Sequence, residues 1–247
     1  MIGLMGAMPE EMNRIIGAIT EKNITELGNR LYHTGKLFGK EVVAVFSRWG
    51  KVAAATTATN LILEYKVDQI IFTGVAGAIS AELNIGDVVI AQRLFQHDMD
   101  ARPLMRRFEI PLTGKTSFEI PDENTRQMAD AVHHFLLNNR EFRKRLAEND
   151  IKNPKMMLGD IASGDLFVSG TEMKNELIRN LPSVVCVEME GAAVAQVCYD
   201  FGVPLQVVRV ISDTADEQAH TSAIGFVNQH GGEYSLAILR EYFKKMD

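Results

Sequence analysis

Short apolar runs alternate along the chain with longer segments in which apolar residues recur every three or four positions. The runs predict buried strands, and the periodic segments predict helices. We expect strands at residues 1–7, 31–37, 41–46, 69–73, 86–94, 155–162, 183–187 and 204–211, and helices at residues 12–19, 51–66, 122–146, 171–179, 191–201 and about 222–245. This alternation predicts one three-layer α/β domain, residues 1–247, around a mixed, largely parallel twisted sheet.

One segment, residues 101–121, departs from this alternation. It contains three prolines, two adjacent arginines and scattered apolar residues. A connection of this length in a folded domain is usually functional or lies at an interface. We therefore expect an ordered functional or interface loop here.

Acidic, hydroxyl and glycine residues gather where five of the predicted strands end. Open α/β sheets bind ligands in the crevice beyond the carboxyl ends of their strands, so these residues are expected to converge on one site. The strand-end residues are Glu10 and Glu11, Gly74 and Gly77, Ser163 and Asp165, Glu188 and Glu190, and Ser212 and Asp213. The pair Glu188 and Glu190 is costly to bury unless it is hydrogen-bonded or bound to a ligand, and a solvated turn is the alternative.

Composition and charge narrow the class of protein. A chain of 247 residues that is 46% hydrophobic is long and apolar enough for one large domain with a full core. The net charge of −6 argues against a nucleic-acid partner, because such partners require clustered basic residues. The two cysteines, Cys186 and Cys198, lie in apolar patterns, so we expect a reducing, cytoplasmic setting. No apolar run is long enough to predict a membrane span.

The residue types at the strand ends favour acid–base chemistry. No serine or cysteine lies in a nucleophile elbow, and no lysine lies among the strand-end residues. His97 with Asp98 and Asp100 suggests a metal site, but one imidazole with two aspartates is more often a hydrogen-bonded turn, so we expect neither metal nor cofactor. Several carboxylates and Arg209 remain. Carboxylates suit the cleavage of a glycosidic bond, in which one activates water and another protonates the leaving group.

Six motifs in order extend this interpretation from the residues to a family. They read Gly6-Ala7-Met8-x-Glu10-Glu11, Gly50-Lys51-Val52, Thr73-Gly74-x-Ala76-Gly77, Ser163-Gly164-Asp165-x-Phe167, Val187-Glu188-Met189-Glu190 and Arg209-x-Ile211-Ser212-Asp213-x-Ala215-Asp216. With these motifs, nearly the whole chain resembles the methylthioadenosine/S-adenosylhomocysteine nucleosidases of the purine nucleoside phosphorylase and uridine phosphorylase superfamily. The resemblance implies a nucleoside phosphorylase-like fold and hydrolysis of a nucleoside.

The resemblance also implies roles for individual residues. Glu11 would be the general base that activates water, and Asp213 the general acid that protonates adenine. Because Asp213 must hold a proton before donating it, we expect burial to raise its pKa. Glu190 would hold the ribose hydroxyls. The other implied substrate-binding residues are Met8, Gly77, Phe167, Val168, Glu188, Met189, Arg209 and Ser212.

Homodimers are common in this family, and a loop of one subunit commonly closes the partner's site. The resemblance therefore implies a homodimer, with Leu104 and Met105 in the long loop as candidates for the contact. The chain departs from the common pattern at Trp49, Val75 and Ala223. These departures leave open the preference among methylthioadenosine, S-adenosylhomocysteine, deoxyadenosine and an aminofutalosine.

Two other functions remain open. Phosphorolysis would need cationic donors for phosphate, for which Arg14 and Arg48 are candidates, whereas the charges of Glu10 and Glu11 would repel that anion. A nucleoside-binding regulator on the same fold is the second alternative. A regulator would be expected to lose the base or an acid, and this chain keeps Glu11 and Asp213.

Overall fold

The computed structural model describes residues 1–149 and 151–246, so Asp150 and Asp247, the last residue of the predicted domain, lie outside the described residues. The strands are β1 (Ile2–Gly6), β2 (Thr20–Leu27), β3 (Arg30–Leu37), β4 (Lys40–Phe46), β5 (Gln69–Ala78), β6 (Val88–Gln96), β7 (Phe118–Glu119), β8 (Met156–Ser163), β9 (Val184–Glu188) and β10 (Leu205–Asp213). The helices are α1 (Pro9–Ala18), α2 (Lys51–Leu63), α3 (Asp122–Asn138), α4 (Arg140–Glu148), α5 (Thr171–Asn180), α6 (Gly191–Phe201), α7 (Ala219–Phe226), the π-helical segment η1 (Val227–Gly231) and α8 (Gly232–Lys244).

The strands belong to one mixed sheet that closes on itself on one side. Strands β2, β3, β4, β1 and β5 follow one another across the open part, and β5 then pairs with both β9 and β10. Because β9, β8, β6 and β10 also pair in that order, these strands and β5 form a ring. Pairing is parallel within β4–β1–β5–β10 and within β6–β8–β9, and antiparallel where the two sets meet. Both faces of the sheet are covered by helices.

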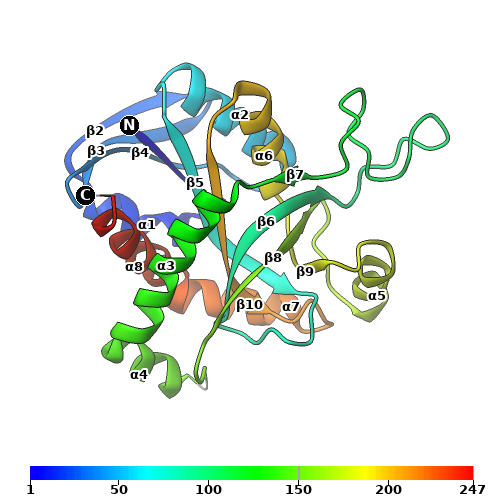
Figure 1. The fold of residues 1–247 in the computed structure, drawn as a ribbon. Coiled ribbons are helices and arrows are strands. Elements are labelled where there is room, and N and C mark those ends of the chain that lie inside the picture. The colour runs from blue at the N-terminus through cyan, green and yellow to red at the C-terminus, as the bar shows by residue number, and fades with distance from the viewer. Residues whose placement is uncertain (150, 247) are drawn as a thin grey trace.

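The helices give the predicted three-layer architecture (Figure 1). Helices α2 and α6 cover one face, with Ala54, Leu61 and Val194 in a core cluster with residues of the sheet. Helices α1, α3 and α8 cover the other face, where Met12, Met128 and other apolar side chains form a second core cluster. The fold class predicted from the alternation is confirmed.

Three elements differ from the predictions for local reasons. The strands predicted at residues 31–37 and 41–46 belong to a three-strand meander, because β2 adds a solvent-exposed edge strand whose mostly polar sequence carries no apolar run. The predicted helix 122–146 breaks at Asn139, whose side chain accepts the Phe142 N–H and caps α4. The predicted helix 222–245 contains α7, η1 and α8, so its middle turn is π-helical.

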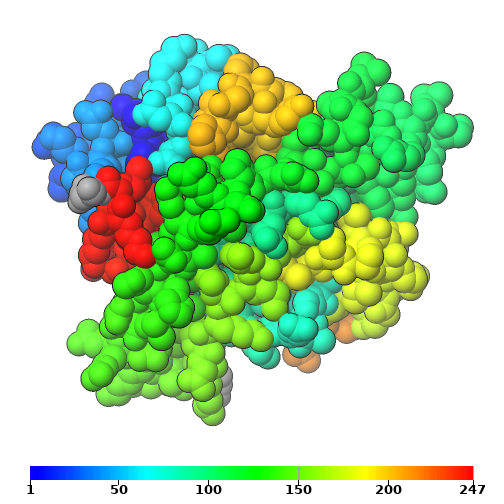
Figure 2. All heavy atoms as spheres, viewed as in Figure 1, coloured from blue at the N-terminus to red at the C-terminus, as the bar shows by residue number. Residues whose placement is uncertain are grey.

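The predicted loop projects from the body of the molecule between β6 and α3, as the green lobe of Figures 1 and 2 shows. Its side chains include Leu104, which is 88% exposed, and Leu112, which is 94% exposed. Met105 is half-buried. Exposed apolar side chains on an ordered projection are typical of a contact surface.

Candidate active site

The ends of several strands surround one cavity of about 350 Å³. The cavity collects side chains from the β1–α1 turn, the end of β5, residues 166–168, the β9–α6 turn, the end of β10 and helix α7. The predicted site residues that line it are Met8, Glu11, Gly77, Phe167, Val168, Glu188, Met189, Glu190, Ser212 and Asp213. Six of the ten strand-end residues that were expected to converge line this cavity, whereas Glu10, Gly74, Ser163 and Asp165 are not among the described residues that line it.

Glu11 lies in the first turn of α1, where its side chain folds back toward the preceding strand. Pro9 begins the helix, and Glu11 Oε2 accepts the N–H groups of Ala7 and Met8 at 2.8 and 2.9 Å. Its Oε1 accepts the N–H of Val75 in β5 at 3.0 Å. Glu11 is only 2% exposed, so these bonds fix a buried carboxylate at the cavity wall.

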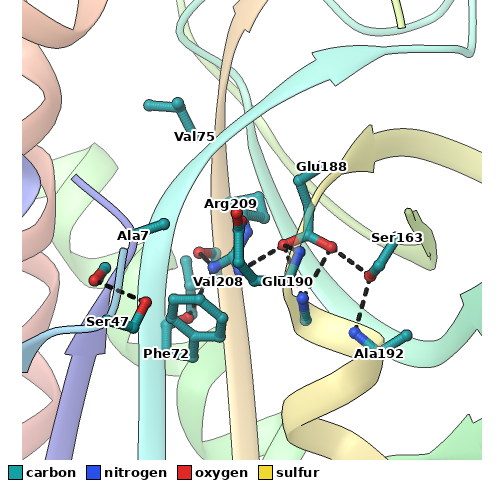
Figure 3. A network of polar contacts seen from close by, with 12 residues as sticks. Ala7, Ser47, Phe72, Val75, Ser163, Glu188, Glu190, Ala192, Val208 and Arg209 are labelled. Carbon is teal, nitrogen blue, oxygen red and sulfur yellow. Dashed lines mark hydrogen bonds and ion pairs between the residues drawn. The ribbon is translucent and has the colours of Figure 1, made fainter. Parts of the chain in front are cut away.

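Glu188 is held by groups of the protein itself (Figure 3). Its carboxylate accepts the Ser163 hydroxyl, and it accepts the N–H groups of Glu190 at 3.1 Å and Gly191 at 2.8 Å. Arg209 Nη2 donates to the same carboxylate at 2.8 Å. Because these bonds already satisfy the carboxylate, the geometry assigns Glu188 to shaping the β9–α6 turn.

Arg209 is 1% exposed and lies beside Glu188, Phe72 and Val208 (Figure 3). Its guanidinium donates to the Phe72 and Val208 carbonyls and stacks 4.1 Å from the centroid of the Phe72 ring. Of the residues predicted to bind substrate, Arg209 is not among the described residues that line the cavity. It acts as the counter-charge of Glu188.

Glu190 and Asp213 face the cavity from the ends of β9 and β10. Glu190 Oε1 accepts the N–H of Gly50 at 2.8 Å. Asp213 accepts the Ala215 N–H at 2.9 Å and the Ser212 hydroxyl at 2.8 Å. Both acids are therefore oriented by neighbouring donors before any substrate arrives.

Burial raises the pKa of three acids that line the cavity, Glu11, Glu190 and Asp213. For Glu11, the charge of Arg209 and three backbone N–H groups oppose the effect of burial. For Glu190, burial and then the charge of Glu188 raise the pKa to about 8. Burial also raises the pKa of Asp213, as expected for a proton donor, although its hydrogen bonds act in the opposite direction.

The small residue Gly77 allows Asp213 to come close to strand β5. A Cβ atom at this position would lie 2.7 Å from Asp213 Oδ1, which is too close for a real contact. Strand β5 extends beyond the predicted strand end at residue 73, because residues 74–78 continue its pairing with β10 and β9. Gly77 therefore serves the packing of the acid as well as the shape of the cavity.

The opposite side of the cavity is apolar. Phe167 is 45% exposed and meets His220 edge-on, with 6.3 Å between ring centroids. The three positions that depart from the common family pattern, Trp49, Val75 and Ala223, all line this cavity. Sequence reasoning did not identify His220, because no motif marked the start of α7.

The turn after β6 does not form a metal site in the described part of the chain. No group of three or more His, Cys, Asp or Glu side chains there could hold a metal ion. Asp98 instead accepts hydrogen bonds from Lys51 Nζ and the Asp165 N–H, and Asp100 pairs with Arg102. This arrangement matches the hydrogen-bonded turn that we weighed against a metal.

Fold and site together define a class of α/β proteins with a cavity at the strand ends that is lined by buried acids. The family model of the phosphorylase superfamily matches residues 1–244. The chain therefore belongs to the phosphorylase superfamily, and the resemblance inferred from the six motifs is confirmed.

Within this superfamily, the chain is similar to nucleosidases. The 5'-methylthioadenosine/S-adenosylhomocysteine nucleosidase of Glaesserella parasuis is 33% identical over 98% of this chain and 99% of the relative. The nucleosidase of the same name from S. pneumoniae, solved with the transition-state inhibitor MT-ImmA, has a TM-score of 0.86 and 31% identity over 100% of this chain and 99% of that chain. Futalosine hydrolase of Helicobacter pylori has a TM-score of 0.84 and 32% identity over 99% of this chain and 97% of that chain.

Proposed function

We propose that this protein hydrolyses the N-glycosidic bond of adenosine-type nucleosides, with 5'-methylthioadenosine and S-adenosylhomocysteine as substrates and adenine and the thioribose as products. The observation that carries this proposal is the meeting of Glu11, Glu190 and Asp213 in one cavity that is apolar on its other side. The relatives named above support the choice of bond and substrate. No cofactor is needed for this reaction.

The three acids divide the work of the reaction. Glu11, ionised, accepts a proton from water as the oxygen attacks C1' of the ribose. Asp213, protonated, gives its proton to the adenine ring as the C1'–N bond breaks. Glu190 forms hydrogen bonds with the ribose hydroxyls and so holds the sugar between the other two acids. Phe167 stacks on adenine, with the Val168 backbone and Gly77 beside it.

Water is a better nucleophile than phosphate for this site. Arg14 and Arg48 were the candidates for binding phosphate, and both are exposed. Arg48 donates to the Asn29 carbonyl at 2.5 Å, and neither arginine is among the described residues that line the cavity. An anion at the position of the attacking water would instead meet the buried carboxylate of Glu11.

Product analysis tests this choice directly. We expect purified protein to release adenine and free thioribose from methylthioadenosine at a rate that does not depend on added phosphate. Formation of the sugar phosphate, only when phosphate is present, would indicate phosphorolysis. Binding of methylthioadenosine without release of adenine under either condition would indicate a regulator.

The preference among related nucleosides depends on the apolar end of the cavity. Trp49, Ala223 and Ile224 are among the apolar residues that line the cavity, and a futalosine hydrolase is among the similar structures. Values of kcat/KM for methylthioadenosine, S-adenosylhomocysteine, 5'-deoxyadenosine and an aminofutalosine rank these substrates.

We also infer a cytoplasmic setting, because Cys186 and Cys198 are both buried and free. The described helices include none that is both long and apolar enough to span a bilayer.

We infer that the protein is a homodimer in which Leu104 and Met105 of one subunit close the partner's cavity. The exposure of Leu104 on a projecting loop supports this contact.

Because a charge at a buried contact must be desolvated, Leu104→Asp is expected to raise KM about tenfold and to weaken the dimer. The control is Leu137→Asp, which replaces a leucine on α3 that is 55% exposed. Sedimentation and steady-state kinetics check both, and an unchanged dimer with unchanged KM contradicts the assignment.

A further inference from the structure

A closed set of hydrogen bonds joins three connections next to the cavity. The Lys51 N–H donates to Asp165 Oδ1 at 2.7 Å, the Asp165 N–H donates to Asp98 Oδ2 at 2.9 Å, and Lys51 Nζ donates to Asp98 Oδ1 at 2.7 Å. Lys51 begins α2, whereas Asp98 and Asp165 follow the ends of β6 and β8. We refer to these three residues as the Lys51–Asp98–Asp165 cluster.

The cluster reaches the cavity through Gly50, whose N–H donates to Glu190 Oε1 at 2.8 Å. Gly50 has φ of 89°, and a Cβ atom there would lie 2.9 Å from Asp165 Oδ1. The Lys51 N–H that donates to Asp165 belongs to the next peptide along the chain, so Asp165 anchors the chain directly after the Gly50 donor. Asp165 thus holds the peptide next to the one that donates to Glu190.

The cluster is shielded and anchored. The side chains of Lys51 and Asp98 are 16% and 18% exposed, so their ion pair is less screened than a surface pair. Lys51 Nζ also donates to Gln96 Oε1 at 3.2 Å, and Gln96 Nε2 donates to Gln196 of α6 at 2.8 Å. The same helix begins directly after Glu190. The donor and the acceptor of the bond between Gly50 and Glu190 are therefore tied to one network.

We propose that the Lys51–Asp98–Asp165 cluster is a positioning unit that presents the Gly50 N–H to Glu190 and so orients the carboxylate that holds the ribose hydroxyls. The proposal rests on the sugar-binding role of Glu190 proposed above. None of the three residues is among the described residues that line the cavity, so they act through Gly50. Without Asp98, the start of α2 and the turn after β8 lose their common partner, and Glu190 loses a fixed donor.

Kinetics with two substrates test this role. Asp98→Ala is expected to lower kcat/KM for methylthioadenosine about 10- to 100-fold, because misplacing a substrate-positioning group costs rates of this order. Asp98→Asn, which keeps one acceptor oxygen, is expected to recover part of the loss. For the 3'-deoxy analogue, which lacks a hydroxyl that Glu190 would hold, the loss should shrink to about twofold or less. An equal loss for both substrates overturns the proposal.

A matched control comes from β6 and β8, the two strands that precede Asp98 and Asp165. Asp160 of β8 is buried and pairs with Arg93 of β6, and neither is among the described residues that line the cavity. Asp160→Asn removes charge from a pair that joins β6 and β8, so it reports a purely structural effect. It should leave the ratio of kcat/KM between the two substrates unchanged. If this ratio changes as much as in Asp98→Ala, the cluster has no special role.

A second measurement does not depend on turnover. Hydrogen exchange of the Gly50 amide, followed in the full-length protein, is expected to be about tenfold faster or more in Asp98→Ala and in Lys51→Met. Lys51→Met removes only Nζ and keeps the backbone donor, so it serves if Asp98→Ala does not fold. Unchanged protection of Gly50 in the folded variants overturns the proposal. If the wild-type protein cleaves neither substrate, the proposed function fails, while the exchange experiment still decides the role of the cluster.

Discussion

Asp213→Asn is expected to lower kcat for methylthioadenosine hydrolysis by about 100- to 10,000-fold, the range that general acid catalysis contributes. Asparagine has nearly the same shape and can accept the Ala215 N–H through its amide oxygen, but it cannot give a proton to adenine. A substrate analogue whose leaving group needs no protonation provides the control, because Asp213→Asn should cleave it nearly as fast as the wild type. A variant that retains most of its activity on methylthioadenosine contradicts the role of Asp213.

The pH dependence of the wild type follows from the direction of the pKa shifts. Asp213 must be protonated, and burial raises its pKa, so activity should fall as the pH rises through that raised pKa. Glu11 must be ionised, so activity should fall as the pH drops through its pKa, which burial also raises. The profile of kcat/KM is therefore expected to be bell-shaped, and Asp213→Asn should lose the alkaline limb. A flat profile in the wild type would remove the case for either acid.

Glu11→Gln is expected to lower kcat by about 100- to 10,000-fold, because glutamine cannot accept a proton from water. Its amide oxygen can replace only one of the two carboxylate oxygens that bind Ala7, Met8 and Val75. Binding of substrate should be retained, so kcat falls much more than KM changes. Single-turnover measurements of adenine release separate the chemical step from product release.

Thermal unfolding controls for damage to the fold in Glu11→Gln. A buried acid with a raised pKa binds its proton more tightly in the folded state, so it contributes less stability as the pH rises above the unfolded pKa. Glutamine carries no charge and removes this dependence. Because glutamine is neutral, the variant avoids the loss of stability that the ionised Glu11 would cause at higher pH. The loss of one accepted backbone hydrogen bond is expected to cost about 1 to 3 kcal/mol, which partly offsets this gain in stability. Loss of activity that only parallels the loss of folded protein would contradict a catalytic role for Glu11.

The sequence was sufficient to predict the alternation of elements and the convergence of strand ends, because buried parallel strands produce recognisable apolar runs. It was insufficient where pairing rather than composition decides the structure. Residues 74–78 are small and resemble a loop, yet they continue β5 because β10 and β9 lie beside them. Strand β2 is mostly polar and solvent-exposed, and it pairs with the edge that β3 offers.

The roles of Glu188 and Arg209 also depended on the structure. In the sequence, Glu188 lies two residues before Glu190, and the residue pattern alone could not assign the two acids different roles. The sheet register puts Ser163 opposite Glu188, and β10 brings Arg209 to the same carboxylate. Glu188 is thereby satisfied within the protein, whereas Glu190 accepts the Gly50 N–H and faces the cavity. Such a distinction depends on contacts between residues far apart in sequence, which local patterns do not encode.

The closure of the strand ring has a consequence for how the protein matures. Strand β10 completes the ring by pairing with both β5 and β6, and it supplies Asp213 together with Arg209, the counter-charge of Glu188. The pairings of β10 with β5 and β6 join the last quarter of the chain to much earlier segments, and such distant contacts form slowly during folding. A chain that ends before β10 contains Glu11 and Glu190 but lacks Asp213, the proposed general acid. The proposed active site can therefore assemble only after β10 has been synthesised.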